Sequence, residues 1–209
     1  MNKIILVTGN MKKLISARQF LEPHGIKVDN VKMDTTEIQS DSIEEIAAFS
    51  AKEASDKLKC TVLKNDTGFF IEALDGFPGP YTHYVMERIG TDGILKLMRG
   101  KTNRKAYYKE AFAYCEYGKE PVIFTAITKG TLATRKSGKY GLTIDPIFIP
   151  EGHDKTMANY NDEERFKLWD TSAFDKIAEY VINKHNDWVV AQSFLWYNFF
   201  NYGGIKWSS

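Results

Sequence analysis

The chain has few cysteines, almost no net charge and no long hydrophobic run, and each absence removes a class of protein. Its 2 cysteines, Cys60 and Cys115, lie far apart without the short spacing of metal ligands, so we expect free thiols. Its 28 Lys and Arg residues offset 27 Asp and Glu residues, and no sustained basic stripe offers a surface for DNA or RNA. A small charged ligand fits this balance better than a nucleic acid polymer.

A membrane protein is not expected either. No apolar run approaches the roughly 20 residues that a bilayer-spanning helix needs. The first residues are typical of a strand and not of a cationic and apolar leader. We therefore expect a cytoplasmic protein without membrane contact.

The composition that is present favours a folded α/β protein. The 209 residues, 43% of them hydrophobic, are enough for one domain or two lobes with a substantial core. We expect strands at 3–8, 26–33, 61–65, 69–74, 105–117 and 121–134, and helices at 10–25, 42–58, 84–99 with a break near Gly90, and 162–184. This order predicts a mixed sheet with flanking helices.

The segment that follows the predicted strand 61–65 is the most informative one. Asn65 and Asp66 precede Thr67 and Gly68, and a loop shaped by glycine and proline comes shortly afterwards. A carboxylate, a hydroxyl and a glycine at a strand end are typical of backbone that approaches a small charged ligand. The alternative is that Asp66 only organises a tight turn.

A second candidate site lies where the first strand passes into the first helix. Thr8, Asn10 and Lys13 place a hydroxyl, an amide and an ammonium around the N-terminus of that helix. Such a terminus presents free N–H groups to an anion, so a phosphate site is indicated. Alternatively, Asn10 is only a helix cap and Lys13 a solvated surface lysine.

Two acids could hold a metal ion. Glu37 and Asp66 offer the few carboxylates that Mg²⁺ takes when phosphate oxygens and water complete its shell. Glu37 is otherwise a surface charge, and Asp145, which precedes Pro146, could simply form a turn.

Together these motifs resemble the inosine/xanthosine triphosphate pyrophosphatase family over roughly residues 1 to 160. The resemblance implies an elongated two-lobed α/β fold with a cleft between the lobes, and a homodimer. It also implies Mg²⁺-dependent cleavage of a non-canonical purine nucleoside triphosphate into monophosphate and pyrophosphate. Asp66 would be catalytic, Glu37 and Asp66 would hold the metal, and the substrate would be bound by Thr8, Asn10, Lys13, Thr67, Gly68, Ile144, Asp145 and Arg165.

Several family positions carry other residues in this chain. Asn65 replaces the first acid of an acidic pair, and Ile144 stands where an aromatic ring would stack on the base. Ser16 replaces a glutamate, Thr143 replaces a glycine, and Asp170 and Thr171 replace the histidine and arginine that read the purine. Losing an acid weakens activation of water more than it weakens binding.

Three functional hypotheses follow from this mixture. The first is a catalytically weakened sensor subunit, like the pyrophosphatase-like subunits of bacterial antiphage systems, which detects a dITP-type nucleotide. The second is an active Mg²⁺-dependent pyrophosphatase, and the third is a relic that binds no nucleotide.

The C-terminal segment differs from the rest. We expect a pyrophosphatase-like domain over 1–184 and an extension over 185–209 that is rich in aromatic residues, among them Trp188, Trp196 and Trp207. Aromatic residues are enriched at interface centres, so an effector protein could bind there. Alternatively, the extension covers the domain's own core.

Overall fold

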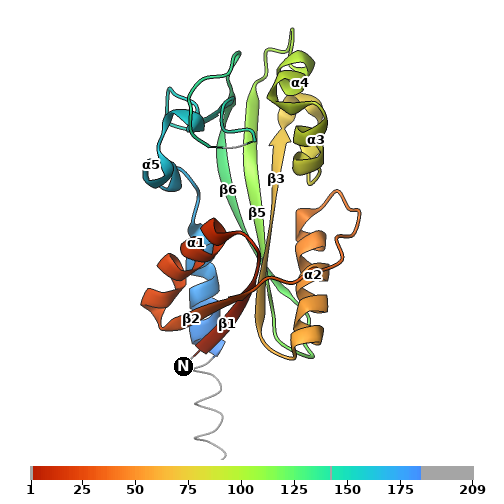
Figure 1. Cartoon of the computed structure of the whole chain (residues 1–209), viewed down its shortest axis with the longest axis vertical. Coiled ribbons are helices and arrows are strands. Elements are labelled where there is room, and N and C mark those ends of the chain that lie inside the picture. Colours follow the sequence, from red (N-terminus) through yellow and green to blue (C-terminus); the bar gives the residue numbers. More distant parts are fainter. Residues whose placement is uncertain (1, 142, 185–209) are drawn as a thin grey trace, which may run out of the picture.

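The computed structural model describes residues 2–141 and 143–184, which form two lobes joined by three long strands (Figure 1). The seven-stranded sheet has the order β2-β1-β3-β5-β6-β7, with β4 paired to β3. The strands are β1 (Asn2–Val7), β2 (Ile26–Val31), β3 (Val62–Ile71), β4 (Pro78–Gly79), β5 (Lys105–Cys115), β6 (Val122–Leu132) and β7 (Phe148–Pro150). The predicted α/β fold with a mixed sheet is confirmed.

The lower lobe in Figure 1 is a three-layer sandwich. Helix α1 (Met11–Leu21), extended by a 3₁₀ turn (Glu22–His24), and a helix over residues 172–184 cover one face of the sheet. Helix α2 (Ile43–Leu58) covers the other face with a row of small residues, among them Ala47, Ala51 and Ala54. Parallel pairing of β1 with β2 and β3 builds the centre.

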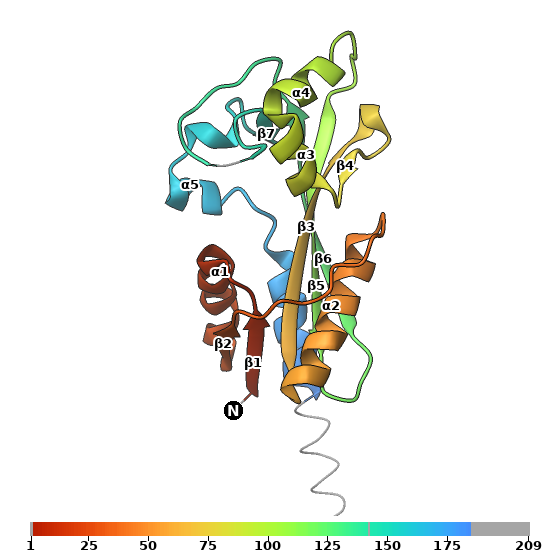
Figure 2. The same cartoon turned by 45° about the vertical axis from the view of Figure 1, so that its right-hand side comes forward.

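The upper lobe surrounds the far ends of β3, β5 and β6 (Figure 2). It contains α3 (Thr82–Arg88), α4 (Gly90–Leu97), α5 (Asp162–Phe166) and 3₁₀ turns at Glu72–Leu74 and Met157–Asn159. Its core is centred on Phe69 and Phe148, whose rings meet edge to face at 5.3 Å. Helix α5 lies above α1, on the same side of the sheet.

Strand β3 does not break at Asp66, so the predicted turn there is wrong. All ten residues from Val62 to Ile71 pair in register with β5, and this continuous ladder satisfies the backbone without a turn. On the opposite edge, β1 pairs with β3 only as far as Leu63. Between Lys64 and Gly68 that edge of β3 therefore has no strand partner among the described residues and is open toward α1, whereas Phe69 and Phe70 pair with β4.

The predicted single helix over 162–184 is also wrong. Helix α5 ends at Phe166, and the next helix begins at residue 172. The Asp170 carboxylate accepts hydrogen bonds from the backbone N–H of Ser172 at 2.9 Å and of Ile127 on β6 at 2.9 Å. Asp170 thereby caps the second helix and ties its start to the sheet.

The predicted hairpin over 105–134 and the helix break near Gly90 are confirmed. Among the described residues, no helix is both long enough and apolar enough to cross a membrane. The predicted extension over 185–209 lies outside the described residues.

Candidate functional site

A cleft of about 790 Å³ lies between the lobes, on the face of the sheet that carries α1 and α5. This volume is in the usual range for a small-molecule site. Several residues predicted from the sequence line it: Asn10, Lys13, Asn65, Thr67, Gly68, Asp145 and Arg165. Residues far apart in the chain thus meet in one cavity.

The loop before α1 is held by its own side chains. The Asn10 side-chain oxygen accepts a hydrogen bond from the Lys12 N–H at 2.9 Å, and the Thr8 hydroxyl accepts one from the Asn10 N–H at 3.0 Å. Asn10 is therefore the helix cap, as one reading of the sequence expected, and it also lines the cleft. Thr8 shapes the loop and does not line the cleft.

Lys13 reaches from α1 to the open edge of β3. Its Nζ donates a hydrogen bond to the backbone oxygen of Asn65 at 3.1 Å. Burial lowers the pKa of the Lys13 ammonium, whereas the charges of Glu110, Asp66 and Glu37 act to raise it. Lys13 is thus a half-buried cation surrounded by carboxylates, and not a solvated surface lysine.

Successive residues of β3 face opposite sides of the sheet. Asn65 and Thr67 face the cleft, whereas Asp66 pairs with Ala111 on the α2 side. Burial raises the pKa of Asp66, and the negative charge of the exposed Glu37 raises it further, while Lys13 lowers it. Neither Asp66 nor Glu37 lines the cleft.

The oxygen donors of Asp66 and Glu37 fit a hard cation such as Mg²⁺, which takes one or two carboxylates plus phosphate oxygens. A cation beside Asp66 would favour its charged form, which burial and, to a smaller extent, the charge of Glu37 disfavour by raising its pKa. Within residues 2–141 and 143–184, no cluster of three or more His, Cys, Asp or Glu side chains could hold a metal ion by itself. Such a site would need ligands from the substrate.

Glu110 is a cleft residue that the sequence analysis missed. It lies on β5 directly opposite Thr67, on the same face as Asn65. Burial raises the pKa of Glu110 to about 7, against the lowering effects of Lys13 and of a hydrogen bond with the Asn65 side chain. A signal for it is present in the sequence: Glu110 is an acid two residues from both Tyr108 and Phe112, and alternate residues of a strand lie on the same face of the sheet.

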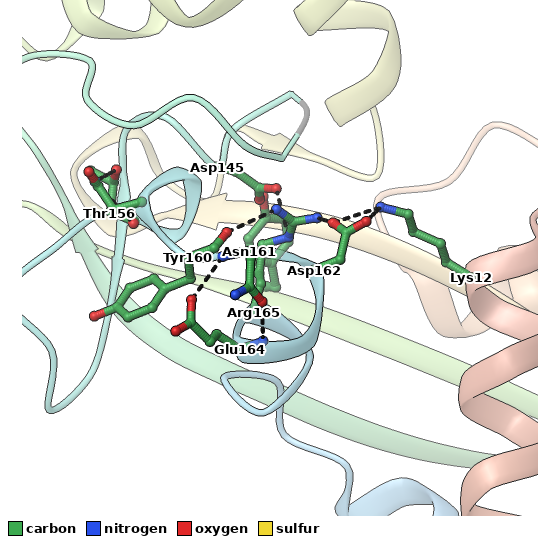
Figure 3. Close-up of polar contacts among 10 residues, drawn as sticks. Lys12, Asp145, Thr156, Tyr160, Asn161, Asp162, Glu164 and Arg165 are labelled. Atoms are coloured by element: carbon green, nitrogen blue, oxygen red, sulfur yellow. Dashed lines mark hydrogen bonds and ion pairs between the residues drawn. The ribbon is translucent and has the colours of Figure 1, made fainter.

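The upper wall of the cleft is a chain of charges, drawn in Figure 3. The buried Arg165 guanidinium lies 3.6 Å from the buried Asp145 carboxylate and forms an ion pair with Asp162. Asp162 also pairs with Lys12 of α1, at 3.2 Å, and so bridges the two lobes. The Tyr108 hydroxyl donates to Asp145 at 3.3 Å.

Helix α5 aims Arg165 into this cluster. The Asn161 side chain accepts from the Glu164 N–H at 2.9 Å and the Glu164 carboxylate accepts from the Asn161 N–H at 3.0 Å, which is a complete capping box. This cap sets the start of α5 and so the direction of Arg165, which is visible in Figure 3.

Thr143, Ile144 and Asp170 lie at positions that the family resemblance assigns to recognition of the base. In this structure their main contacts support the fold. Ile144 is fully buried in the upper core, and Thr143 holds a left-handed backbone with φ 53°, where a glycine would be less strained. Asp170 lines the cleft, but its two carboxylate oxygens accept hydrogen bonds from backbone N–H groups. The aromatic rings at this end of the cleft belong to Tyr108 and Trp169, with centroids 4.7 Å apart.

Comparisons with known proteins agree on the relationship. The model of the Ham1 family matches residues 4–180. A dITP/XTP pyrophosphatase of Methanopyrus kandleri is 46% identical over 182 residues, which cover 87% of this chain and 97% of that protein. A dITP/XTP pyrophosphatase of Methanosarcina acetivorans is 39% identical over 185 residues, covering 88% and 100%.

Solved structures show the same fold. The Staphylococcus aureus Ham1 protein superposes with a TM-score of 0.76 at 24% identity, covering 88% of this chain and 100% of that chain. The Coxiella burnetii HAM1 protein has the same TM-score and coverage at 23% identity. At these identities the structural likeness establishes the fold alone.

Proposed function

This chain belongs to the Ham1 family, and on that premise we propose that it hydrolyses a deaminated purine nucleoside triphosphate, of the ITP, dITP or XTP type. The products are the nucleoside monophosphate and pyrophosphate, and the reaction uses Mg²⁺. The observation that carries the proposal is the cleft itself, where a half-buried Lys13 meets the N-terminus of α1 and a group of carboxylates.

Each end of the cleft suits one part of such a substrate. Lys13 and the free N–H groups at the start of α1 are suited to the triphosphate. The half-buried Trp169 lines the cleft and offers an aromatic ring to a purine, and Arg165 is a donor held in place by Asp145.

Asp66 and Glu37 are the residues that would hold Mg²⁺. When bound, the ion would neutralise phosphate charge and polarise the phosphoryl group under attack. Lys13, held at the edge of β3 by its bond to the Asn65 oxygen, would add a second positive charge for the phosphates.

The sensor hypothesis predicts binding without turnover. Asn65, Asp170 and Thr171 support it, whereas relatives called pyrophosphatases at up to 46% identity support the enzyme. The enzyme is the better-supported reading. The homodimer, the effector partner and the antiphage role stay predictions.

The deciding experiment incubates the purified full chain and Mg²⁺ with ITP, dITP, XTP, ATP or GTP. We expect pyrophosphate release from the deaminated nucleotides on the order of 1 s⁻¹ or faster, and much slower release from ATP and GTP. Calorimetry on the same samples measures binding separately. Tight binding of dITP without pyrophosphate release would instead establish the sensor reading.

A further inference from the structure

The segment between β2 and α2 carries Glu37 but has no regular structure of its own. Residues 32–42 are neither helix nor strand, and Glu37 lies exposed near their middle. Fixing each residue of such a segment in one conformation costs entropy. A side chain that must meet a metal ion from this segment therefore needs support from another element.

Helix α2 gives that support at the residue directly before Glu37. The Glu53 carboxylate accepts a hydrogen bond from the Thr36 backbone N–H at 2.6 Å and another from the Thr36 hydroxyl at 3.2 Å, one on each oxygen. The buried Ser50 hydroxyl, three residues earlier on α2, donates to the Thr36 backbone oxygen at 3.2 Å. Thr36 is thus held at its N–H, its carbonyl and its side chain, and bonds to a carboxylate are the stronger kind.

We propose that Glu53 is a positioning residue for the Mg²⁺ site: by fixing the backbone of Thr36, it fixes where Glu37 presents its carboxylate. This inference rests on the proposed function, in which Glu37 and Asp66 hold the ion. Asp66 is held by the continuous pairing of β3 with β5. Glu37 lies outside the sheet, so the geometry of the two acids depends on the bonds from α2.

Glu53 acts through the loop and not as a ligand, because both of its oxygens already accept hydrogen bonds. One accepts from the Thr36 N–H, and the other accepts from the Thr36 hydroxyl and from the Lys57 ammonium at 2.7 Å. Residues that support a metal ligand in this indirect way typically account for about 10- to 100-fold in metal affinity.

A different role for Glu53 would be to stabilise the fold without any effect on the metal. The two roles make different predictions for the removal of its carboxylate. A positioning residue affects only the part of nucleotide binding that depends on Mg²⁺, and only while Glu37 is present. A purely structural residue changes stability and affects binding alike with and without the metal.

The test measures binding of an α,β-methylene dITP analogue, which resists cleavage, by calorimetry in Mg²⁺ and again in EDTA. Glu53→Ala should weaken binding about tenfold in Mg²⁺ and leave binding in EDTA unchanged. Glu53→Gln keeps one oxygen for the Thr36 N–H and should lose only about threefold. Lys57→Ala is the matched control, because it removes the other partner of Glu53 but leaves the bonds to Thr36, and it should bind like the wild type.

A double substitution shows whether the effect passes through Glu37. Because Glu53 acts on the metal only through Glu37, adding Glu53→Ala to Glu37→Ala should cause no further loss of binding in Mg²⁺. An equal loss with and without Glu37, or an equal loss in EDTA, would overturn the inference.

Thermal melting shows whether each variant is folded, and Glu53→Gln decides alone if Glu53→Ala does not fold. If the wild type gains affinity from Mg²⁺ but the folded Glu53 variants bind as it does, this inference alone is overturned. If the wild type binds the analogue equally in Mg²⁺ and in EDTA, the metal site of the proposed function is overturned together with it.

Discussion

Lys13 is the residue on which the phosphate end of the cleft depends. Its ammonium is half-buried at the open edge of β3, and burial lowers its pKa while Glu110, Asp66 and Glu37 support its charge. A cation already withdrawn from water and balanced by carboxylates loses little further hydration when a phosphate arrives. It should therefore contribute strongly to the binding of an anion.

Lys13→Ala should weaken dITP binding by about 1.5 to 3 kcal/mol, the usual contribution of a hydrogen bond to a charged group. Calorimetry with the α,β-methylene analogue measures this loss without turnover. Lys57→Ala, which removes an exposed lysine from α2, is the matched control and should bind like the wild type. Equal affinity of Lys13→Ala and the control would remove Lys13 from the phosphate site.

The sequence predicted some site residues and not others for a physical reason. Lys13, Thr67 and Arg165 lie in local motifs, and the structure places all three in the cleft. Glu110 has no local motif, because its neighbours in the cleft come from β3 and α1 through sheet pairing. Ile144 shows the opposite case: it belongs to a local motif, but its side chain is buried in the core and does not line the cleft.

At the scale of single elements, hydrophobic patterning predicted where most helices and strands lie. The Ser42 cap of α2 and the hairpin of β5 and β6 followed from local signals. The two errors, at Asp66 and near Asp170, have one cause. Both aspartates resemble turn residues or helix residues locally, but long-range pairing with β5 and β6 decides the conformation.

Asp170→Ala should destabilise the protein by about 1 to 2 kcal/mol, because it removes the cap of the last described helix and the bond to Ile127. Denaturant unfolding measures the loss, with Asp175→Ala on the exposed side of the same helix as control. A loss no larger than that of the control would contradict the capping role.

The same contact makes a pH prediction. Burial acts to raise the pKa of Asp170, but hydrogen bonds from Ser172 and Ile127 outweigh it, so the folded pKa lies below the ordinary value of 3.8. A depressed pKa stabilises the fold above the unfolded value, and this stabilisation is lost as the pH falls through the folded value. The stability difference between wild type and Asp170→Ala should therefore be full at pH 7 and smaller at pH 3. An unchanged difference would show that the Asp170 charge is not involved.

At the scale of the whole molecule, the two lobes share one sheet and meet again across the cleft. The Lys12–Asp162 ion pair and the stacked rings of Phe20 and Phe166, with centroids 5.7 Å apart, connect α1 to α5. Because the ion pair is exposed, it adds little stability. The sheet, and not the cleft contacts, holds the lobes together, so the cleft can admit a ligand without unfolding either core.

Among the described residues, side chains as far along the chain as Val181 contribute to the core of the lower lobe. Ala173 and Ile177 of the last described helix are fully buried in it, and Val181 is 5% exposed. The Ham1 family match also ends at residue 180. The domain we propose over 1–184 keeps these core side chains together. The aromatic residues of 185–209, which can each bury roughly 150 to 250 Å², are candidates for an interface with another protein.

Ending the chain after Lys184 should therefore leave a soluble protein that melts cooperatively and binds the dITP analogue as the full chain does. Calorimetry and thermal melting check these two properties, and gel filtration checks solubility. If the extension binds an effector, as its aromatic content suggests, only the full chain should retain that partner on purification. A truncated chain that aggregates, or that melts without a cooperative transition, would instead show that the extension covers the domain's own core, and the proposed boundary at 184 would then be wrong.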